Sequence, residues 1–283
     1  MATNSYFEAH KRGKAFLQVH GKDEDALLYL LLEQLHWTKT QWLLQMNEEI
    51  PQDVEELLKE DVRLLMKDMP PQYILGYTEF YGLNFHVTED TLIPRVETEE
   101  LVELILAKTQ DVELTCVDIG TGSGAIAISL QKNRKNWTVY ATDISQKALQ
   151  VARANGIELG AAVDFKETNI LDDLSGPFDI IVSNPPYISK KEISEMDQSV
   201  LKYEPQSALF AENDGLYFYE EIAKAAEKKL AKGGKIFLEI GYEQKDAVEN
   251  IFRQHFPKKK IQTFKDLSGH DRMVLVEDVF KKS

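Results

Sequence analysis

The spacing of apolar residues divides the chain into a helical part and a part that mixes strands with helices. From residue 1 to about 70, apolar residues recur at helical spacing, and four helices are expected at 6–19, 26–35, 38–46 and 51–66. Gly21 separates the first two helices, and Pro70-Pro71 ends the helical run because proline cannot continue a helix. The sequence therefore predicts a small helical domain at residues 1–70.

A β-rich segment at 71–90 follows, in which Gly82 lies between two short runs of strand formers and predicts a hairpin link. From residue 91 onward, apolar strands alternate with helices, as is typical of an α/β fold with a mainly parallel sheet. We expect strands at 114–119, 137–141, 163–166, 178–183 and 235–240, a turn at 233–234, and a closing antiparallel pair at 261–264 and 272–277. We expect helices from residue 97 or 98 to 106, and at 125–130, 148–156, 216–229 and 248–256. Residues 91–283 are thus predicted to form a Rossmann-like domain.

A glycine-rich loop follows the first strand of this domain and directly precedes a helix. Its glycines let the backbone approach a ligand, and the N–H groups of a helix N-terminus attract negatively charged groups. The next strand ends at Asp143, 19 residues past Gly124, where a ribose-hydroxyl acceptor is expected. The spacing predicts a nucleotide-type cofactor but does not distinguish NAD from S-adenosylmethionine. The loop consists of Gly120, Thr121, Gly122, Ser123 and Gly124.

A second candidate site is Asn184-Pro185-Pro186-Tyr187, which follows the apolar strand 178–183. The prolines carry no N–H and restrict the residue before each of them, so the loop presents mainly acceptors beside the Tyr187 ring. The Asn184 oxygen and a free carbonyl suit a planar NH2 group of an amide or an aminopyrimidine. Binding both hydrogens at a pyramidal angle would turn the nitrogen lone pair toward an electrophile. Asn-Pro-Pro alone is a common turn sequence, but the upstream glycine loop favours a functional site.

Composition and charge limit the classes of partner. The formal net charge of −14 argues against a nucleic-acid partner, because binding to nucleic acid depends on neutralising phosphates. A single cysteine, Cys116, excludes an internal disulfide and a cysteine-rich metal site, and its apolar strand makes it a core residue. No apolar run approaches membrane-spanning length, and the N-terminus lacks the apolar core of a signal peptide. We therefore expect a cytoplasmic protein that has no membrane segment.

The two loops together resemble those of methyltransferases that use S-adenosylmethionine and act on amino or amide groups. The chain is most similar to the HemK/PrmC-type release factor glutamine methyltransferases, and the resemblance covers nearly its whole length. Stretches 72–76 and 92–95 lie outside the core shared by methyltransferases in general and are specific to this family. The other matching stretches are 97–99, 118–124, 184–188, 204–205, 214–216, 239–241 and 266–272.

The resemblance implies a helical domain that recognises the partner, a hairpin link and a seven-stranded Rossmann-like methyltransferase domain. It implies methyl transfer from S-adenosylmethionine to the side-chain amide nitrogen (N5) of the glutamine in the Gly-Gly-Gln motif of class I peptide chain release factors. No metal ion and no covalent enzyme intermediate are needed, because the sulfonium already supplies the leaving group. Members often have proline where this chain has Val96, so we expect the loop from Ile93 to Glu99 to be looser here. They also often have aspartate near the position of Asn169.

Carried over to this chain, the resemblance implies a role for each candidate residue. The loop from Gly120 to Gly124 would contact the methionine part of the cofactor, and Asp143 would hold the ribose hydroxyls. Asn169 would pair with adenine and Ile170 would pack on its ring, although a plain loop is an alternative interpretation of these two residues. Asn184 and the Pro185 carbonyl would hold the target amide, with Pro186 completing the loop and Tyr187 near the substrate or the sulfonium.

Two other functions share these features. An adenine-N6 DNA methyltransferase, or an rRNA amino-group methyltransferase, would use the same cofactor site and acceptor loop, but it requires a basic groove that the net charge argues against. A non-enzymatic binding module that kept the fold would not need an acceptor loop beside an intact glycine loop.

Overall fold

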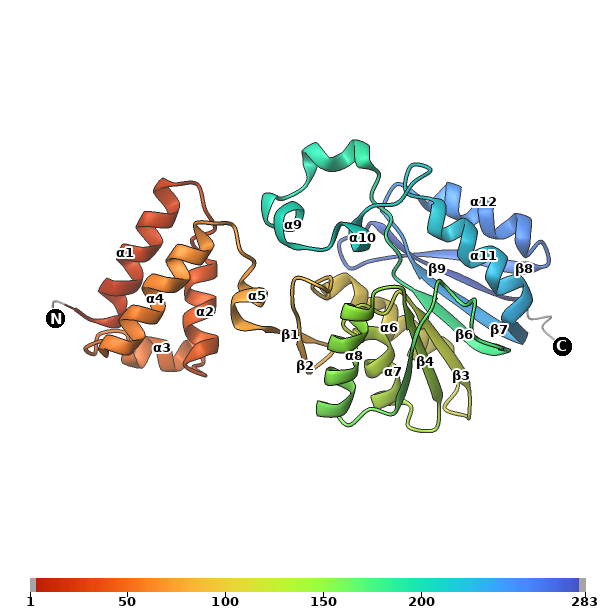
Figure 1. Ribbon diagram of the computed structural model, residues 1–283, viewed down its shortest axis with the longest axis horizontal. Helices are drawn as coiled ribbons and strands as arrows, with labels where there is room; N and C mark the ends of the chain where they lie inside the picture. The colour runs from red at the N-terminus through yellow and green to blue at the C-terminus, as the bar shows by residue number, and fades with distance from the viewer. Residues whose placement is uncertain (1–3, 280–283) are drawn as a thin grey trace. The chain divides into compact units, whose positions relative to one another are not determined.

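The computed structural model describes residues 4–279, which form two compact units (Figure 1). The helical unit comprises the described residues up to Tyr77 together with Met196–Tyr203. The α/β unit comprises the described residues of Thr78–Glu195 and from Glu204 onward. No helix within residues 4–279 has both the length and the apolar character needed to span a membrane.

The helical unit contains the four predicted helices, packed around a buried leucine cluster. They are α1 (Tyr6–Val19), α2 (Ala26–Gln34), α3 (Lys39–Gln45) and α4 (Gln52–Leu65). Leu17, Leu27, Leu30 and Leu31 are fully buried. Thr38 begins α3 with a capping box, in which its hydroxyl accepts from Gln41 N and the Gln41 side chain accepts from Thr38 N.

The boundary between the units differs from the predicted division at residues 70 and 90. A short helix, α5 (Pro71–Leu75), occupies the start of the expected link and belongs to the helical unit. The predicted hairpin is present as β1 (Tyr77–Phe80) and β2 (Leu83–His86). Helix α9 (Gln198–Tyr203) also joins the helical unit: Lys202 Nζ and the Tyr203 hydroxyl donate to Lys67 O at 2.5 and 3.0 Å. These contacts link residues 135 and 136 positions apart, so local sequence patterns do not reveal them.

The α/β unit is built on a seven-stranded sheet with the order β5-β4-β3-β6-β7-β9-β8, as predicted for a Rossmann-like methyltransferase domain. The central strands are parallel, and β9 pairs antiparallel with both β7 and β8. The strand order reverses between β3 and β6, which is where open α/β sheets bind ligands. The strands are β3 (Thr115–Ile119), β4 (Thr138–Asp143), β5 (Val163–Glu167), β6 (Phe178–Ser183), β7 (Leu230–Glu239), β8 (Lys259–Lys265) and β9 (Asp271–Asp278).

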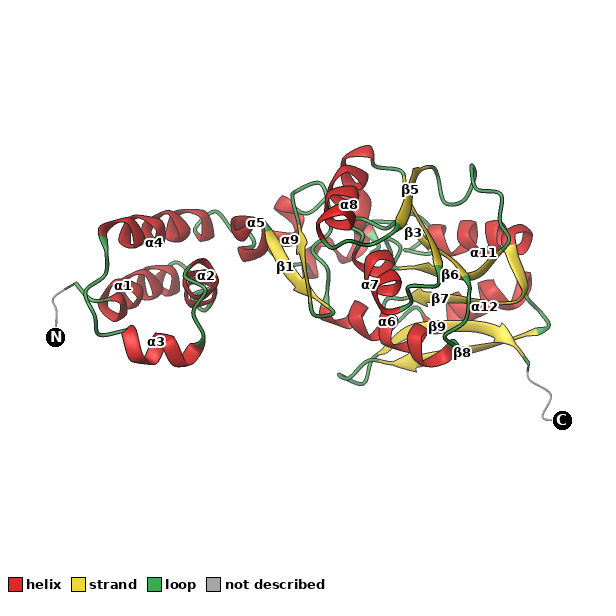
Figure 2. Ribbon diagram, turned by 90° about the horizontal axis from the view of Figure 1, so that it is seen from below, coloured by secondary structure: helices red, strands yellow, loops and turns green. Residues whose placement is uncertain are grey.

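Helices cover both faces of this sheet (Figure 2). On one face, α6 and α7 contribute to a buried cluster that includes Leu101 and Ile128, and α8 packs against β4 and β5. On the other face, Tyr219 and Phe252 anchor α11 and α12. The helices of this unit are α6 (Val96–Lys108), α7 (Ala125–Asn133), α8 (Gln146–Glu158), α10 (Gln206–Leu209), α11 (Tyr217–Lys229) and α12 (Lys245–His255), together with the 3₁₀ helix η1 (Lys190–Glu195).

Two local predictions differ from the structure. The turn predicted at 233–234 is part of β7, whose pairing with β6 shifts between Leu230 and Lys235, so the glycines form an irregularity within the strand. Helix α6 begins at Val96, before the expected Glu97 or Thr98, and its N-cap is Arg95. The Thr98 hydroxyl does not cap the helix but donates to Glu239 Oε2. Val96 is the first residue of α6, a position that also favours proline. The helix starts there although this chain lacks the proline that family members often have.

Candidate active site

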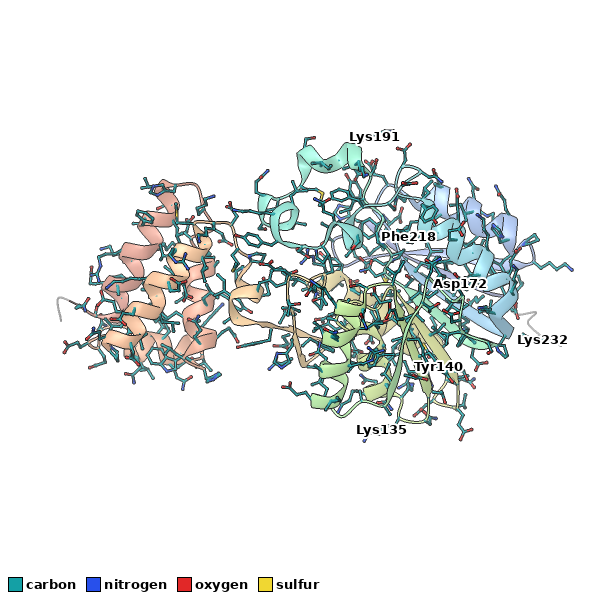
Figure 3. All side chains as sticks on the ribbon, viewed as in Figure 1. Lys135, Tyr140, Asp172, Lys191, Phe218 and Lys232 are labelled. Atoms are coloured by element: carbon teal, nitrogen blue, oxygen red, sulfur yellow. The ribbon has the colours of Figure 1, made fainter. Side chains whose placement is uncertain are left out.

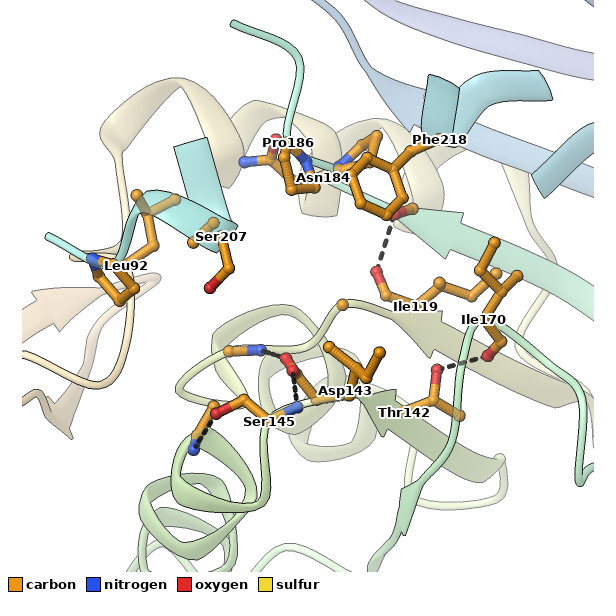
Figure 4. Close-up of a pocket in the computed structure, with 18 of the residues that line it drawn as sticks. Leu92, Ile119, Thr142, Asp143, Ser145, Ile170, Asn184, Pro186, Ser207 and Phe218 are labelled. Atoms are coloured by element: carbon orange, nitrogen blue, oxygen red, sulfur yellow. Dashed lines mark hydrogen bonds between the residues drawn. The ribbon is translucent and has the colours of Figure 1, made fainter. Parts of the chain in front are cut away.

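The two predicted loops meet at one pocket of the α/β unit (Figure 4). The glycine loop follows β3 and the Asn184 loop follows β6, and these strands are neighbours in the sheet. Gly120, Gly122, Asn184, Pro185 and Pro186 line the pocket. The rest of the lining comes from Asp90, Thr91, Leu92, Ile119, Thr142, Asp143, Ile144, Ser145, Ala148, Thr168, Asn169, Ile170, Ser183, Pro205, Ser207, Ala208, Phe218 and Ile222.

Hydrogen bonds hold the strand ends around the pocket in register. The Ser183 hydroxyl donates to Ile119 O at 2.8 Å, which joins the start of the Asn184 loop to the strand that precedes the glycine loop. Gly120 N donates to Thr142 O at 2.9 Å. Gly120 and Gly122 have φ values of +70° and +55°, which residues with a Cβ rarely adopt, and space is open where a Cβ would stand. The backbone of the glycine loop is thus exposed to a ligand.

Asp143 is the carboxylate at the base of the pocket. Its Oδ2 accepts from Gly122 N at 2.9 Å and its Oδ1 accepts from Ser145 N at 2.8 Å (Figure 4). Burial raises its pKa, and these backbone hydrogen bonds oppose that rise. A carboxylate oxygen has two lone-pair directions, so each oxygen retains capacity to accept a hydroxyl from a ligand.

Apolar side chains flank this carboxylate and give the pocket its second chemical feature. Ile144 is largely exposed although it follows Asp143 directly, and Ala148 and Ile170 also line the pocket. Phe218, labelled in Figure 3, comes from α11 and packs against the hydrophobic cluster that contains Tyr219. A carboxylate for a diol, apolar walls for a flat ring and an open glycine backbone together fit an adenosine-type cofactor such as S-adenosylmethionine.

Asn169 and Ile170 both line the pocket. Ile170 has a φ of +52°, and Ile170 O accepts from the Thr142 hydroxyl at 2.9 Å. The Asn169 side chain is exposed, and its Nδ2 lies 3.4 Å from Asp172 Oδ2. Among residues 4–279, the hydrogen-bond contact of the Asn169 side chain is this long one, so the side chain is available to a ligand.

Four of the predicted site residues are outside the lining described for residues 4–279: Thr121, Ser123, Gly124 and Tyr187. The Thr121 hydroxyl donates at 2.6 Å to Asp118, whose burial raises its pKa to about 7. Ser123 O accepts from Asn155 Nδ2 at 2.9 Å. Gly124 precedes α7, and a Cβ there would lie 2.9 Å from Ile128 Cδ1. These three residues hold the loop in shape through contacts with the protein.

Tyr187 packs against the hydrophobic cluster that contains Tyr219, and burial raises its pKa. Its carbonyl accepts from Gln244 Nε2 at 2.9 Å. These contacts hold the end of the Asn184 loop, and the position of Tyr187 near the substrate or the sulfonium stays a prediction.

Asn184 has partners that the sequence did not identify as part of the site. Its Nδ2 donates to the Thr98 hydroxyl at 3.1 Å, and that hydroxyl donates to Glu239 Oε2 at 2.7 Å. Both residues lie in stretches that match the family, 97–99 and 239–241, which was the available signal. Thr98 was instead predicted as a possible start of a helix, because nothing local reveals a partner 141 positions away.

Comparisons with known proteins cover both units. Residues 8–76 match the PrmC N-terminal domain, and residues 98–207 match the methyltransferase small domain. The release factor glutamine methyltransferase of Enterococcus faecalis is 49% identical over 96% of this chain and 99% of that protein. The protein of the same name from Bacillus subtilis is 39% identical over 95% of this chain and 96% of its own length.

A solved methyltransferase structure from Pyrococcus furiosus supports the fold. It has a TM-score of 0.54 and 18% sequence identity, and the match covers 78% of this chain and 99% of that chain. At this identity the likeness concerns the fold alone.

Proposed function

Because this chain belongs to the release factor glutamine methyltransferase family, we propose that it methylates the side-chain amide nitrogen (N5) of the glutamine in the Gly-Gly-Gln motif of class I release factors, with S-adenosylmethionine as donor. The observation that carries the proposal is that a residue suited to hold the target amide and a residue suited to hold the cofactor line one pocket. The acceptor residue Asn184 and the carboxylate Asp143 line the same cavity, beside the glycine loop. The proposal places the enzyme in the cytoplasm, where translation terminates.

The pocket residues divide into those suited to the donor and those suited to the amide. Gly120 and Gly122 would let the backbone approach the methionine part, and Asp143 would accept the ribose hydroxyls. Asn169 and Ile170 would meet the adenine. When bound, S-adenosylmethionine supplies an electrophilic methyl group and its own leaving group.

The acceptor loop answers the main chemical difficulty, which is that an amide nitrogen is a poor nucleophile. Its lone pair is delocalised into the carbonyl. Asn184 Oδ1 and the Pro185 carbonyl would each accept one amide hydrogen and hold the nitrogen in line with the methyl group. Acceptors that fit the pyramidal nitrogen better than the planar one stabilise the transition state selectively. The nitrogen becomes more acidic as its conjugation is lost, so this step requires no strongly basic side chain.

The direct test is mass spectrometry of a purified class I release factor after incubation with the protein and S-adenosylmethionine. We expect one methyl group on the glutamine of the Gly-Gly-Gln motif. Parallel incubations contain duplex DNA and ribosomal RNA. Methylated adenine or guanine with an unmodified release factor would contradict the proposal and favour an amino-group methyltransferase acting on nucleic acid.

Replacement of Asp143 by alanine is expected to weaken S-adenosylmethionine binding by about 1–3 kcal/mol, because buried ribose hydroxyls lose a charged acceptor. Isothermal titration calorimetry measures the effect. Asp90→Ala is the matched control, since Asp90 also lines the pocket but pairs with the exposed Lys147 at 3.1 Å. Equal losses in the two variants would show a general effect of charge, and unchanged affinity in Asp143→Ala would reject the ribose assignment.

We further propose that the helical unit contributes to recognition of the release factor. A single glutamine offers few contacts, so selectivity requires binding energy from surfaces remote from the reacting atoms. Helix α3 carries two consecutive exposed leucines, Leu43 and Leu44, with 67% and 72% of their surfaces accessible. Exposure of such apolar side chains to water is unfavourable, so a partner that covers them binds more tightly.

A Leu43→Ser/Leu44→Ser double variant is expected to raise KM for the folded release factor at least about tenfold. A tenfold change corresponds to about 1.4 kcal/mol, which is less than one fully covered leucine contributes, at about 1.5–3 kcal/mol. The kcat should be unchanged, and so should the rate on a short peptide that contains the Gly-Gly-Gln motif. Ile157→Ser is the control, because Ile157 is 84% exposed on α8 of the other unit. An unchanged KM in the double variant would remove α3 from the recognition surface.

A further inference from the structure

A chain of two hydrogen bonds leads from the acceptor residue Asn184 to a carboxylate buried in the α/β unit. Asn184 Nδ2 donates to Thr98 Oγ1 at 3.1 Å, and Thr98 Oγ1 donates to Glu239 Oε2 at 2.7 Å. Only 4% of Thr98 and 2% of Glu239 is accessible to solvent. Neither residue is in the pocket lining described for residues 4–279, so an effect of either on a ligand is indirect, and Asn184 is the lining residue to which Thr98 is bonded.

The direction of these bonds determines how the Asn184 amide is turned. Its two ends have nearly the same shape, but the oxygen accepts while the nitrogen donates. An ionised carboxylate can only accept, so the single Thr98 hydrogen points to Glu239. Thr98 Oγ1 can therefore only accept a hydrogen bond from Asn184, so the nitrogen of the Asn184 amide must face Thr98. The Asn184 oxygen is then directed away from Thr98 and is free to accept from a substrate.

Charged and titratable groups from four segments surround Glu239. Burial raises its pKa to about 7, while the hydrogen bond from Thr98 and the charge of Arg272 lower it. Glu97 on α6 opposes ionisation, and a hydrogen bond from Tyr187 favours it. Arg272 on β9 is held by Asp266 Oδ2 at 3.1 Å and by Ile240 O at 3.2 Å. Tyr219 on α11 donates its hydroxyl to Glu239 O at 3.0 Å.

We propose that Thr98 and Glu239 are positioning residues that keep the Asn184 oxygen directed at the target amide, and that the carboxylate form of Glu239 is the active one. This inference rests on the proposed function, because only an acceptor for an NH2 group needs the oxygen in that place. When Glu239 takes up a proton, the acid can donate to Thr98. The Thr98 hydrogen is then released toward Asn184 and competes with the substrate for the amide oxygen.

The sign of the pH effect follows from the raised pKa. Above about pH 7 Glu239 is ionised and the acceptor is correctly turned, whereas below that pH the protonated form predominates. Turnover on the release factor is therefore expected to fall as the pH drops below about 7. We call this fall in kcat, which we attribute to protonation of Glu239, the acid limb.

The test compares Thr98→Val, which keeps the shape of threonine without its hydroxyl, with Thr98→Ser, which keeps the hydroxyl. Full-length proteins are assayed on intact release factor from below to above pH 7, and S-adenosylmethionine affinity is measured by calorimetry. Thr98→Ser should retain the wild-type rate and acid limb. Thr98→Val should lose about tenfold in kcat, the size of one net hydrogen bond, and should lose the acid limb. Cofactor affinity should be unchanged in both variants.

A second variant covers the case in which Thr98→Val does not fold. Glu239→Gln is neutral at every pH, and its amide group can donate to Thr98 as the protonated acid does. Because position 239 no longer titrates, this variant should lack the acid limb.

An active wild-type enzyme whose Thr98→Val or Glu239→Gln variant keeps both the rate and the acid limb would overturn this inference alone. A wild-type protein that binds S-adenosylmethionine but leaves the release factor unmodified would overturn the proposed function, and this inference with it.

Discussion

Replacement of Asn184 by alanine is expected to reduce turnover on the release factor about a hundredfold or more, as is typical when a preorganised transition-state hydrogen bond is removed. The side chain provides one of two acceptors in the Asn184 loop, and alanine has none. The loss should appear in kcat, because the hydrogen bonds that count are those strengthened as the amide nitrogen becomes pyramidal. Single-turnover kinetics with saturating S-adenosylmethionine measures the chemical step.

The size of this effect depends on how firmly the acceptor is held. Asn184 is joined to Thr98, and Ser183 is joined to Ile119 O, so both neighbouring positions of the loop are fixed to other strands or helices. A mobile acceptor would have to be ordered at the moment of reaction and would contribute less.

Asn169→Ala is the matched control for Asn184→Ala. It removes an asparagine that lines the same pocket and whose side chain lies at a long 3.4 Å from Asp172 Oδ2. Its effect is expected mainly on cofactor affinity, with little change in kcat. Near-normal turnover in Asn184→Ala, or equal losses of kcat in the two variants, would remove the acceptor role from Asn184.

The elements that lead to the pocket were predictable because their signals are local. The apolar run before Gly120 and the one before Asn184 each mark a buried strand, and they occur at the positions of β3 and β6. In a parallel sheet built from βαβ units, loops that follow neighbouring strands meet at one edge. The sequence thus led to both loops and to the edge of the sheet at which they line one pocket.

The contacts that brace the pocket were not predictable, because their partners are distant in sequence and share no periodic pattern. Asn155 illustrates this: it is buried on α8, its Oδ1 accepts from His86 N at 2.8 Å, and its Nδ2 donates to Ser123 O at 2.9 Å. One side chain thereby connects the hairpin to the glycine loop. From sequence, residue 155 was only one position in a helix at 148–156.

The association of α9 with the helical unit has the same origin. Residues 196–203 follow the Asn184 loop along the chain, and the sequence offered no reason to separate them from the 91–283 domain. Their contacts with the helical unit include two side chains that donate to Lys67 O and an ion pair of Lys202 with Asp68 at 4.0 Å. Composition and periodicity identify elements, whereas individual side-chain contacts such as these decide which unit a short element joins.

At Gly215, the addition of a single methyl group is expected to displace the end of the Asn184 loop. A Cβ there would lie 2.1 Å from Tyr187 O and 2.5 Å from Gln244 Nε2, the two atoms that form the hydrogen bond at the end of the loop. Tyr187 O belongs to the backbone, so the overlap cannot be relieved by rotation of a side chain. The Gly215 backbone also has a φ of +86°, which is unfavourable for alanine.

Gly160→Ala separates the two costs of Gly215→Ala, because Gly160 has a φ of +62° but open space where the Cβ would stand. Both variants should lose about 1–2 kcal/mol from the left-handed backbone. Gly215→Ala should lose a further 1–3 kcal/mol or so from overpacking, with at least about a tenfold drop in kcat as Tyr187 and Gln244 move apart. Urea denaturation and turnover on the release factor measure the two effects. If the two variants lose equal stability and Gly215→Ala keeps its turnover, the close approach of Gly215 to Tyr187 does not hold the Asn184 loop in place.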